Sequence, residues 1–121
     1  MNSPHKIRVA TDFSPVPLGR FPNDSPFNGT TFREKWLLPA LATHTTFQVD
    51  FDGAEGYGSS FLEEAFGGLV RLNGFNSNEV LNRINLVSKE DPTLIDEVRQ
   101  YIQDASQANQ KIDIGTSSQG Q

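Results

Sequence analysis

The sequence contains no cysteine, only one methionine and one tryptophan, and no long hydrophobic run. Without cysteine, the chain can form no disulfide bond, thiolate nucleophile or thiolate metal site. No apolar run reaches membrane-spanning length, and the first residues, MNSPHKIRVATDF, lack the core of a signal peptide. We therefore expect a cytoplasmic protein that does not contact a membrane.

Positive charge is also scarce. Ten lysines and arginines face fifteen aspartates and glutamates, which gives a formal net charge of −5. Nucleic-acid binding needs a basic face, so we expect no nucleic-acid partner. The chain does have nine phenylalanines, which indicate a phenylalanine-rich core, and its 121 residues are enough for one domain.

The most informative stretch runs from residue 47 to residue 70. Phe47, Val49 and Phe51 alternate with polar residues, as in a strand with one buried face. A glycine-rich turn follows, and Ser60 with Glu63 forms an S-x-x-E capping box, which predicts a helix with Ser60 as its N-cap. Ser59 would then lie just outside the helix, exposed on the turn. One apolar stripe predicts the buried face of this helix: Phe61, Leu62, Ala65, Phe66, Leu69 and Val70.

The rest of the chain alternates short strands with helices. We expect strands at 6–11 and 84–87. We also expect a helix that is capped by Thr30 or Thr31 and ends or kinks near Leu38, before Pro39. Further helices are predicted after Asn76 and after Asp91-Pro92. Four prolines predict that residues 12–30 form a loop, and loops of that length are often functional. The predicted fold is a small single α/β domain over 1–106, a mixed β-sheet with helices packed on it, followed by a disordered polar tail at 107–121.

Ser59 does not have the surroundings of a catalytic serine. A serine nucleophile needs an adjacent base, and the only histidines are His5 and His44, neither of which the sequence places near it. The acids at 50–55 and 63–64 could attract a divalent cation, but their spacing fits no calcium loop. We therefore expect no enzyme activity, no metal and no cofactor.

Two arginines bracket the proline-rich loop. Arg20 and Arg33 could form a clamp for a phosphate or a partner carboxylate. They could instead pair internally with Asp24, Glu34 or the acids of the turn and lock the loop onto the body. We favour internal pairing, because an arginine in a first helical turn gains nothing from the helix dipole.

At this point the pattern resembles the STAS family of anti-sigma-factor antagonists, and more closely the STAS-like group DUF4325. The resemblance lies in the strand, turn, serine pair and helix of VDFDGAEGYGSSFLEEAFGGL. Shorter matches are Gly19-Arg20, Asn28-Gly29, Phe32-Arg33 and Leu38-Pro39.

The resemblance implies a STAS-like regulatory domain that docks a histidine-kinase-like ATPase or a related signalling or defence partner. It also implies phosphorylation at Ser59, although Glu63 and Glu64 would repel an added phosphate, so constitutive docking is our hypothesis. The alternative is a sensor of nucleotides or other anions that uses Arg20, Arg33 and the helix N-terminus. The predicted docking and binding residues are Ser59, Ser60, Arg20, Arg33, Asp52, Glu55, Tyr57, Glu63 and Glu64.

Overall fold

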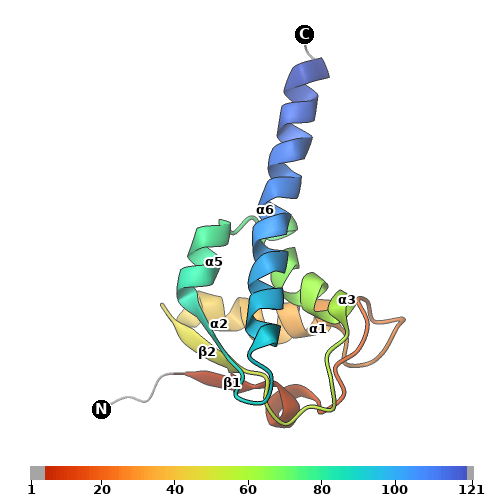
Figure 1. Cartoon of the computed structure of the whole chain (residues 1–121), viewed down its shortest axis with the longest axis vertical. Helices are drawn as coiled ribbons and strands as arrows, with labels where there is room; N and C mark the ends of the chain where they lie inside the picture. Colours follow the sequence, from red (N-terminus) through yellow and green to blue (C-terminus); the bar gives the residue numbers. More distant parts are fainter. Residues whose placement is uncertain (1–4, 120–121) are drawn as a thin grey trace.

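The computed structural model describes residues 5–119, with side chains over 5–107. Its sheet has three strands, β1 (Lys6–Arg8), β2 (Phe47–Asp50) and β3 (Ile84–Val87), in the order β1-β2-β3 (Figure 1). All three run parallel, whereas we expected a mixed sheet. Parallel pairing follows from the connections, because helices carry the chain back between one strand and the next. The fold is α/β, as the sequence predicted.

The two faces of the sheet differ in character. Ile7, Val49 and Leu86 are register neighbours, and all three are buried under the helices. Parallel sheets usually have both faces covered. Here the opposite face carries polar neighbours that are partly or fully exposed and can contact water: Lys6, Gln48 and Asn85.

The first strand is shorter than predicted. It ends at Arg8, and the chain then forms a single π-helical turn, η1 (Val9–Phe13), where we expected the strand to reach Thr11. The Asp12 carboxylate accepts a hydrogen bond from the Arg8 backbone N–H at 2.7 Å. This local bond, which periodicity does not reveal, draws the chain out of the strand.

The first long helical segment consists of α1 (Gly29–Phe32), η2 (Arg33–Leu37) and α2 (Leu38–Thr43). Its N-cap is Asn28, whose side chain accepts from the Thr31 N–H at 2.9 Å, so our expectation of a threonine cap was wrong. The segment also continues through Pro39. The π-helical turn η2 comes directly before the proline, and there the Leu38 N–H donates to the Arg33 carbonyl five residues back. Such widened turns accommodate interruptions of the α-helical ladder.

The second segment, α3 (Ser59–Leu62), η3 (Glu63–Gly67) and α4 (Gly68–Arg71), lies at the centre of the molecule. The predicted apolar stripe is confirmed, since every member of it is at most 5% exposed. Aromatic rings from three parts of the chain meet here. The ring centroids of Phe32 and Phe61 lie 5.8 Å apart, and the Phe66 centroid lies 6.3 Å from that of Phe32 and 5.8 Å from that of Phe51. The core is therefore rich in phenylalanine, as composition indicated.

The remaining helices are α5 (Ser77–Arg83) and α6 (Thr93–Gln119). Asn76 caps α5 by accepting from the Asn78 N–H at 2.9 Å, which confirms that cap. Asp91 accepts from the Thr93 N–H at 3.2 Å, so the predicted start of α6 is also correct.

The α6 helix extends well beyond the rest of the molecule (Figure 1). Among its residues whose side chains the structure describes (93–107), the last buried apolar one is Ala105, close to the predicted domain boundary at 106. The helix nevertheless runs on to Gln119, so no irregular segment separates the expected tail from it. The disorder of that tail stays a prediction, and residues 1–4 and 120–121 lie outside the described residues. Within the described range, no helix combines the length and apolarity needed to cross a bilayer.

Candidate functional site

The turn after β2 is joined to the turn after β3 by hydrogen bonds. Asp52 accepts bonds from the Lys89 and Glu90 backbone N–H groups at 2.9 and 3.0 Å, and Glu90 accepts from the Gly53 N–H at 3.0 Å. The backbone donors at Glu90 and Lys89 hold the Asp52 pKa below its usual value. Gly53 has a φ of +95°, which favours glycine. Asp52, a predicted binding residue, therefore stabilises this edge of the sheet.

Tyr57 closes the turn over the end of β2. Its hydroxyl donates to the Phe51 carbonyl at 2.7 Å, and the two rings pack edge to face at 5.2 Å. Burial, followed by the negative charges of Asp50, Asp52 and Glu90, raises the pKa of Tyr57. The phenol is therefore neutral at physiological pH.

The serine pair does not form the predicted capping box. The helix begins at Ser59 with Gly58 as its N-cap, and no side chain caps it. Glu63 cannot complete a box, because its carboxylate is held by Arg20 and Arg71. Ser59 is exposed, as expected, but it is the first helical residue and does not lie outside the helix.

The proline-rich loop lies beside the turn. The Glu55 N–H donates to the Pro15 carbonyl at 2.8 Å, and Leu18 is the nearest side chain to Gly58. Leu18 and Phe27 pair through their backbones at 3.0 Å, and Asp24 accepts from two backbone N–H groups within the loop. Four large apolar side chains on this ordered loop are 42–53% exposed, and we call them the apolar patch: Val16, Leu18, Phe21 and Phe27.

Behind the loop, three arginines and two glutamates form what we call the ionic cluster: Arg20, Arg33, Glu63, Glu64 and Arg71. Arg33 and Glu64 are almost fully buried, and their side chains are 2.8 Å apart. Arg20 binds both glutamates, and Arg71 reaches Glu63 at 2.8 Å. Burial alone would raise the Glu64 pKa, but hydrogen bonds from Arg33 and Arg20 outweigh it and hold that pKa below its usual value. The cluster ties the loop to the central helix.

Two glycines leave space for this cluster because they have no side chain. A Cβ on Gly68 would lie 2.3 Å from Nη1 of Arg33, and a Cβ on Gly29 would lie 2.7 Å from the Phe61 carbonyl oxygen. Gly67, where a Cβ would lie 2.6 Å from Oε2 of Glu63, is packed equally closely.

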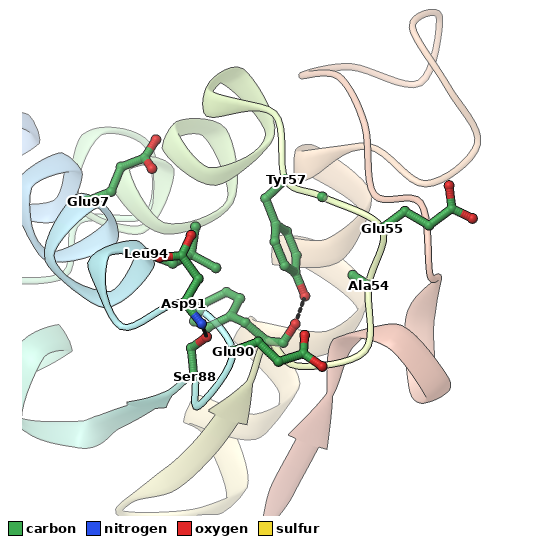
Figure 2. A pocket seen from close by; sticks show the side chains of 10 residues that line it. Ala54, Glu55, Tyr57, Ser88, Glu90, Asp91, Leu94 and Glu97 are labelled. Atoms are coloured by element: carbon green, nitrogen blue, oxygen red, sulfur yellow. Dashed lines mark hydrogen bonds between the residues drawn. The ribbon is translucent and has the colours of Figure 1, made fainter.

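A pocket of about 270 Å³ opens between the two turns at the carboxyl end of the sheet (Figure 2). Phe51, Tyr57 and Leu94 contribute apolar surface, and Glu90 and Asp91 contribute carboxylates. In parallel α/β sheets, ligands bind outside the carboxyl ends of strands. Among the described residues, no group of three or more potential ligands could hold a metal ion.

Comparison with known families decides the assignment. The sequence profile of a STAS-like domain of unknown function (DUF4325) matches residues 28–94, more than half of the 121 residues. The chain belongs to this family. The STAS-like match spans the turn and the helix acids, whereas the apolar patch comes before its first residue. No curated protein and no solved structure gave a significant match.

The structure brings most of the predicted site residues of this STAS-like domain together, but in two groups. Arg20, Arg33, Glu63 and Glu64 form the ionic cluster, which places Arg33 in the interior rather than at a surface clamp. The other group lies around the turn after β2, with Asp52, Glu55, Tyr57 and the serine pair.

Sequence reasoning missed Arg71, the apolar patch, and the contribution of Glu90 and Asp91. Arg71 lies eight residues after Glu63, two helical turns away on the same face, so helical spacing could have found it. The apolar patch gives no periodic signal, because it lies on a loop.

Proposed function

We propose that this STAS-like domain is a non-enzymatic regulatory domain that docks a protein partner. The docking surface comprises the Gly53–Ser60 turn, the exposed side of the helix that follows, and the proline-rich loop. The observation that carries the proposal is the apolar patch. Its Leu18 and Phe21 side chains are both more than half exposed, and Leu18 lies beside the turn at Gly58. Several large apolar side chains exposed on one ordered loop are typical of protein–protein contact sites.

The partner class is inferred from resemblance to STAS antagonists. It is a histidine-kinase-like ATPase or a related protein of a signalling or defence system in the bacterial cytoplasm. Ser59 is exposed at the start of α3, where such a partner could reach it. Glu63 lies one helical turn further on, so an added phosphate would meet a carboxylate. Constitutive docking without phosphorylation is therefore the version we propose.

A non-enzymatic role agrees with the position of the histidines. His5 and His44 stack with ring centroids 4.2 Å apart. They precede β1 and β2, and parallel strands share their amino-terminal edge, so this pair lies at the opposite edge from Ser59. Among the described residues, Ser59 has no histidine beside it to act as a base.

A second candidate is an anion sensor, favoured by the excess of arginines in the ionic cluster. Arg20 and Arg71 have side chains 33% and 28% exposed, whereas Arg33 is committed to Glu64. A nucleotide that binds the native state there would raise the melting temperature. ATP and GTP titrations that leave the melting temperature unchanged would count against this candidate.

The docking proposal is tested with a Leu18→Ser/Phe21→Ser variant. A partner isolated by pull-down from native lysate is purified, and its Kd for wild type and variant is measured. We expect binding at least about tenfold weaker, a loss of about 1.4 kcal/mol, while the free energy of unfolding changes by less than about 0.5 kcal/mol.

Asn78→Ser/Asn82→Ser is the control, because both residues are exposed on α5, which lies on the other side of the molecule from the loop (Figure 1). It should bind normally. Ser59→Asp, tested in the same assay, should weaken binding through added charge on the turn. Normal binding by the loop variant would contradict the proposal.

A further inference from the structure

The pocket beside Tyr57 is lined by both apolar and acidic residues. Its apolar surface comes from Phe51, Tyr57 and Leu94. Of its ten lining residues, none is lysine, arginine or histidine, and four are acids: Glu55, Glu90, Asp91 and Glu97. Figure 2 shows Tyr57 on one side of the pocket and Asp91 with Leu94 on the other, while the carboxylates of Glu55 and Glu97 point away. A cavity of this composition is complementary to a cation that carries apolar surface.

Three of these acids use only one carboxylate oxygen for internal bonds. Oε1 of Glu90 accepts from Gly53, Oδ1 of Asp91 accepts from Thr93, and Oε2 of Glu97 accepts from the Tyr101 hydroxyl. Within the part of the chain that the structure describes, the second oxygen of each has no hydrogen-bond partner. The bonded oxygens hold the carboxylates in place, and the other oxygens are available to donors from outside.

The size of the pocket favours a single side chain. Its volume of about 270 Å³ is just below the ~300–1,000 Å³ typical of pockets for small molecules and cofactors. An arginine side chain suits it best. The guanidinium can stack on the Tyr57 ring and donate through two N–H groups to one carboxylate such as that of Asp91, which a lysine ammonium does less well.

We propose that this pocket receives an arginine side chain of the protein partner. The inference deepens the proposed function and rests on it, because the same Ala54–Tyr57 segment lines the pocket and contacts the proline-rich loop. The partner therefore presents apolar residues to the apolar patch and an arginine to the pocket. Its docking segment is basic, which complements the net charge of −5.

The pocket can be tested without the partner. Blocked Gly-Arg-Gly is titrated into ¹⁵N-labelled protein at low ionic strength, and backbone amide shifts are followed by NMR. We expect saturable shifts at Gly56, Tyr57 and Leu94. The same peptide with citrulline, the neutral isostere of arginine, should bind at least about tenfold more weakly, and the lysine peptide should fall between them.

The matched protein variant is Glu90→Gln/Asp91→Asn/Glu97→Gln. Each amide keeps an acceptor oxygen for the internal bond, so the fold is retained, but the charges are removed. The control Glu34→Gln/Asp96→Asn/Asp104→Asn removes three charges from exposed positions outside the pocket lining. We expect the pocket variant to lose at least about tenfold in affinity for the arginine peptide, and the control to stay within about twofold of wild type.

Equal binding of the citrulline peptide, or unchanged binding by the pocket variant, would overturn the inference. These results are distinguishable from failure of the proposed function. If the pocket experiment fails while Leu18→Ser/Phe21→Ser still abolishes partner binding, docking stands and only the arginine assignment falls. If the loop variant binds its partner normally, the proposed function falls whatever the peptide does.

Discussion

At the scale of single residues, one neighbouring side chain, that of Arg33, requires glycine at position 68. Its place in a helix interior would ordinarily make alanine the better residue, by about 1 kcal/mol. Yet a Cβ there would lie 2.3 Å from Nη1 and 3.2 Å from Cδ of Arg33, a buried side chain held by Glu64. The arginine cannot move without disturbing a buried ion pair, so steric conflict outweighs helix propensity.

We therefore expect Gly68→Ala to lower the free energy of unfolding by about 1–3 kcal/mol, the usual cost of overpacking. Chemical denaturation measures this. Gly56→Ala is the control, because a Cβ at Gly56 would meet nothing within 4 Å, and it should cost nothing. Equal stability of the two variants would show that Arg33 does not lie against Gly68.

At the scale of elements, the helical segments 29–43 and 59–71 each contain a π-helical turn. Each of these two turns contributes one residue of the buried ion pair. Arg33 is the first residue of η2, and Glu64 is the second residue of η3. Widened turns of this kind occur often at functional sites. Here they direct two charged side chains toward each other in the interior, where neither would be stable alone.

The long helix α6 has a packed half and a projecting half. Over 93–107, where the structure describes side chains, its buried residues are Leu94, Val98, Ile102 and Ala105. We expect truncation after Gln107 to change the melting temperature by less than about 2 °C, because so few apolar groups lie beyond that point. Differential scanning calorimetry checks this. Ile102→Ala is the contrasting variant and should cost about 2–5 kcal/mol. A large loss on truncation would mean that the tail docks on the body.

At the scale of the whole molecule, the ionic cluster makes stability depend on pH. The pKa of Glu64 is lower in the folded state than its usual value, so near pH 4 the unfolded chain binds the proton more readily. The stabilisation is therefore complete above the unfolded pKa of about 4.3, and it is lost as pH falls through the folded pKa. Asp24 and Asp52, whose pKa values are also lowered by backbone hydrogen bonds, act in the same direction.

Glu64→Gln tests this. At pH 7 it should lower the free energy of unfolding by about 3–5 kcal/mol, because Arg33 is left buried without its charge partner. The difference from wild type should shrink as pH falls below about 4.3, because the unfolded wild-type chain takes up a proton first and folded Glu64 loses its charge only at still lower pH. Glu34→Gln, at an exposed position, should leave the curve unchanged. A difference that is constant with pH would show that Glu64 is not ionised in the native protein.

Much of this protein was predictable from its sequence, because periodicity reports burial directly. The alternation of Phe47, Val49 and Phe51 predicted a strand, and the stripe from Phe61 to Val70 predicted the central helix and its buried face. The Asn76 cap and the helix start at Asp91 depend on residues a few positions apart, so they too were predictable. The STAS-like resemblance followed from the same local pattern.

Only the tertiary structure decided how the charges are used. Ser60 and Glu63 have the spacing of a capping box, but Arg20, 43 residues away in sequence, and Arg71 take the glutamate. Arg33 lies in the interior because its side chain pairs there with the Glu64 carboxylate. The pocket forms because parallel pairing brings the turns after β2 and β3 to the same edge of the sheet. A charged side chain pairs with the strongest partner that the fold brings close to it. The distance in space between two such groups cannot be read from local sequence.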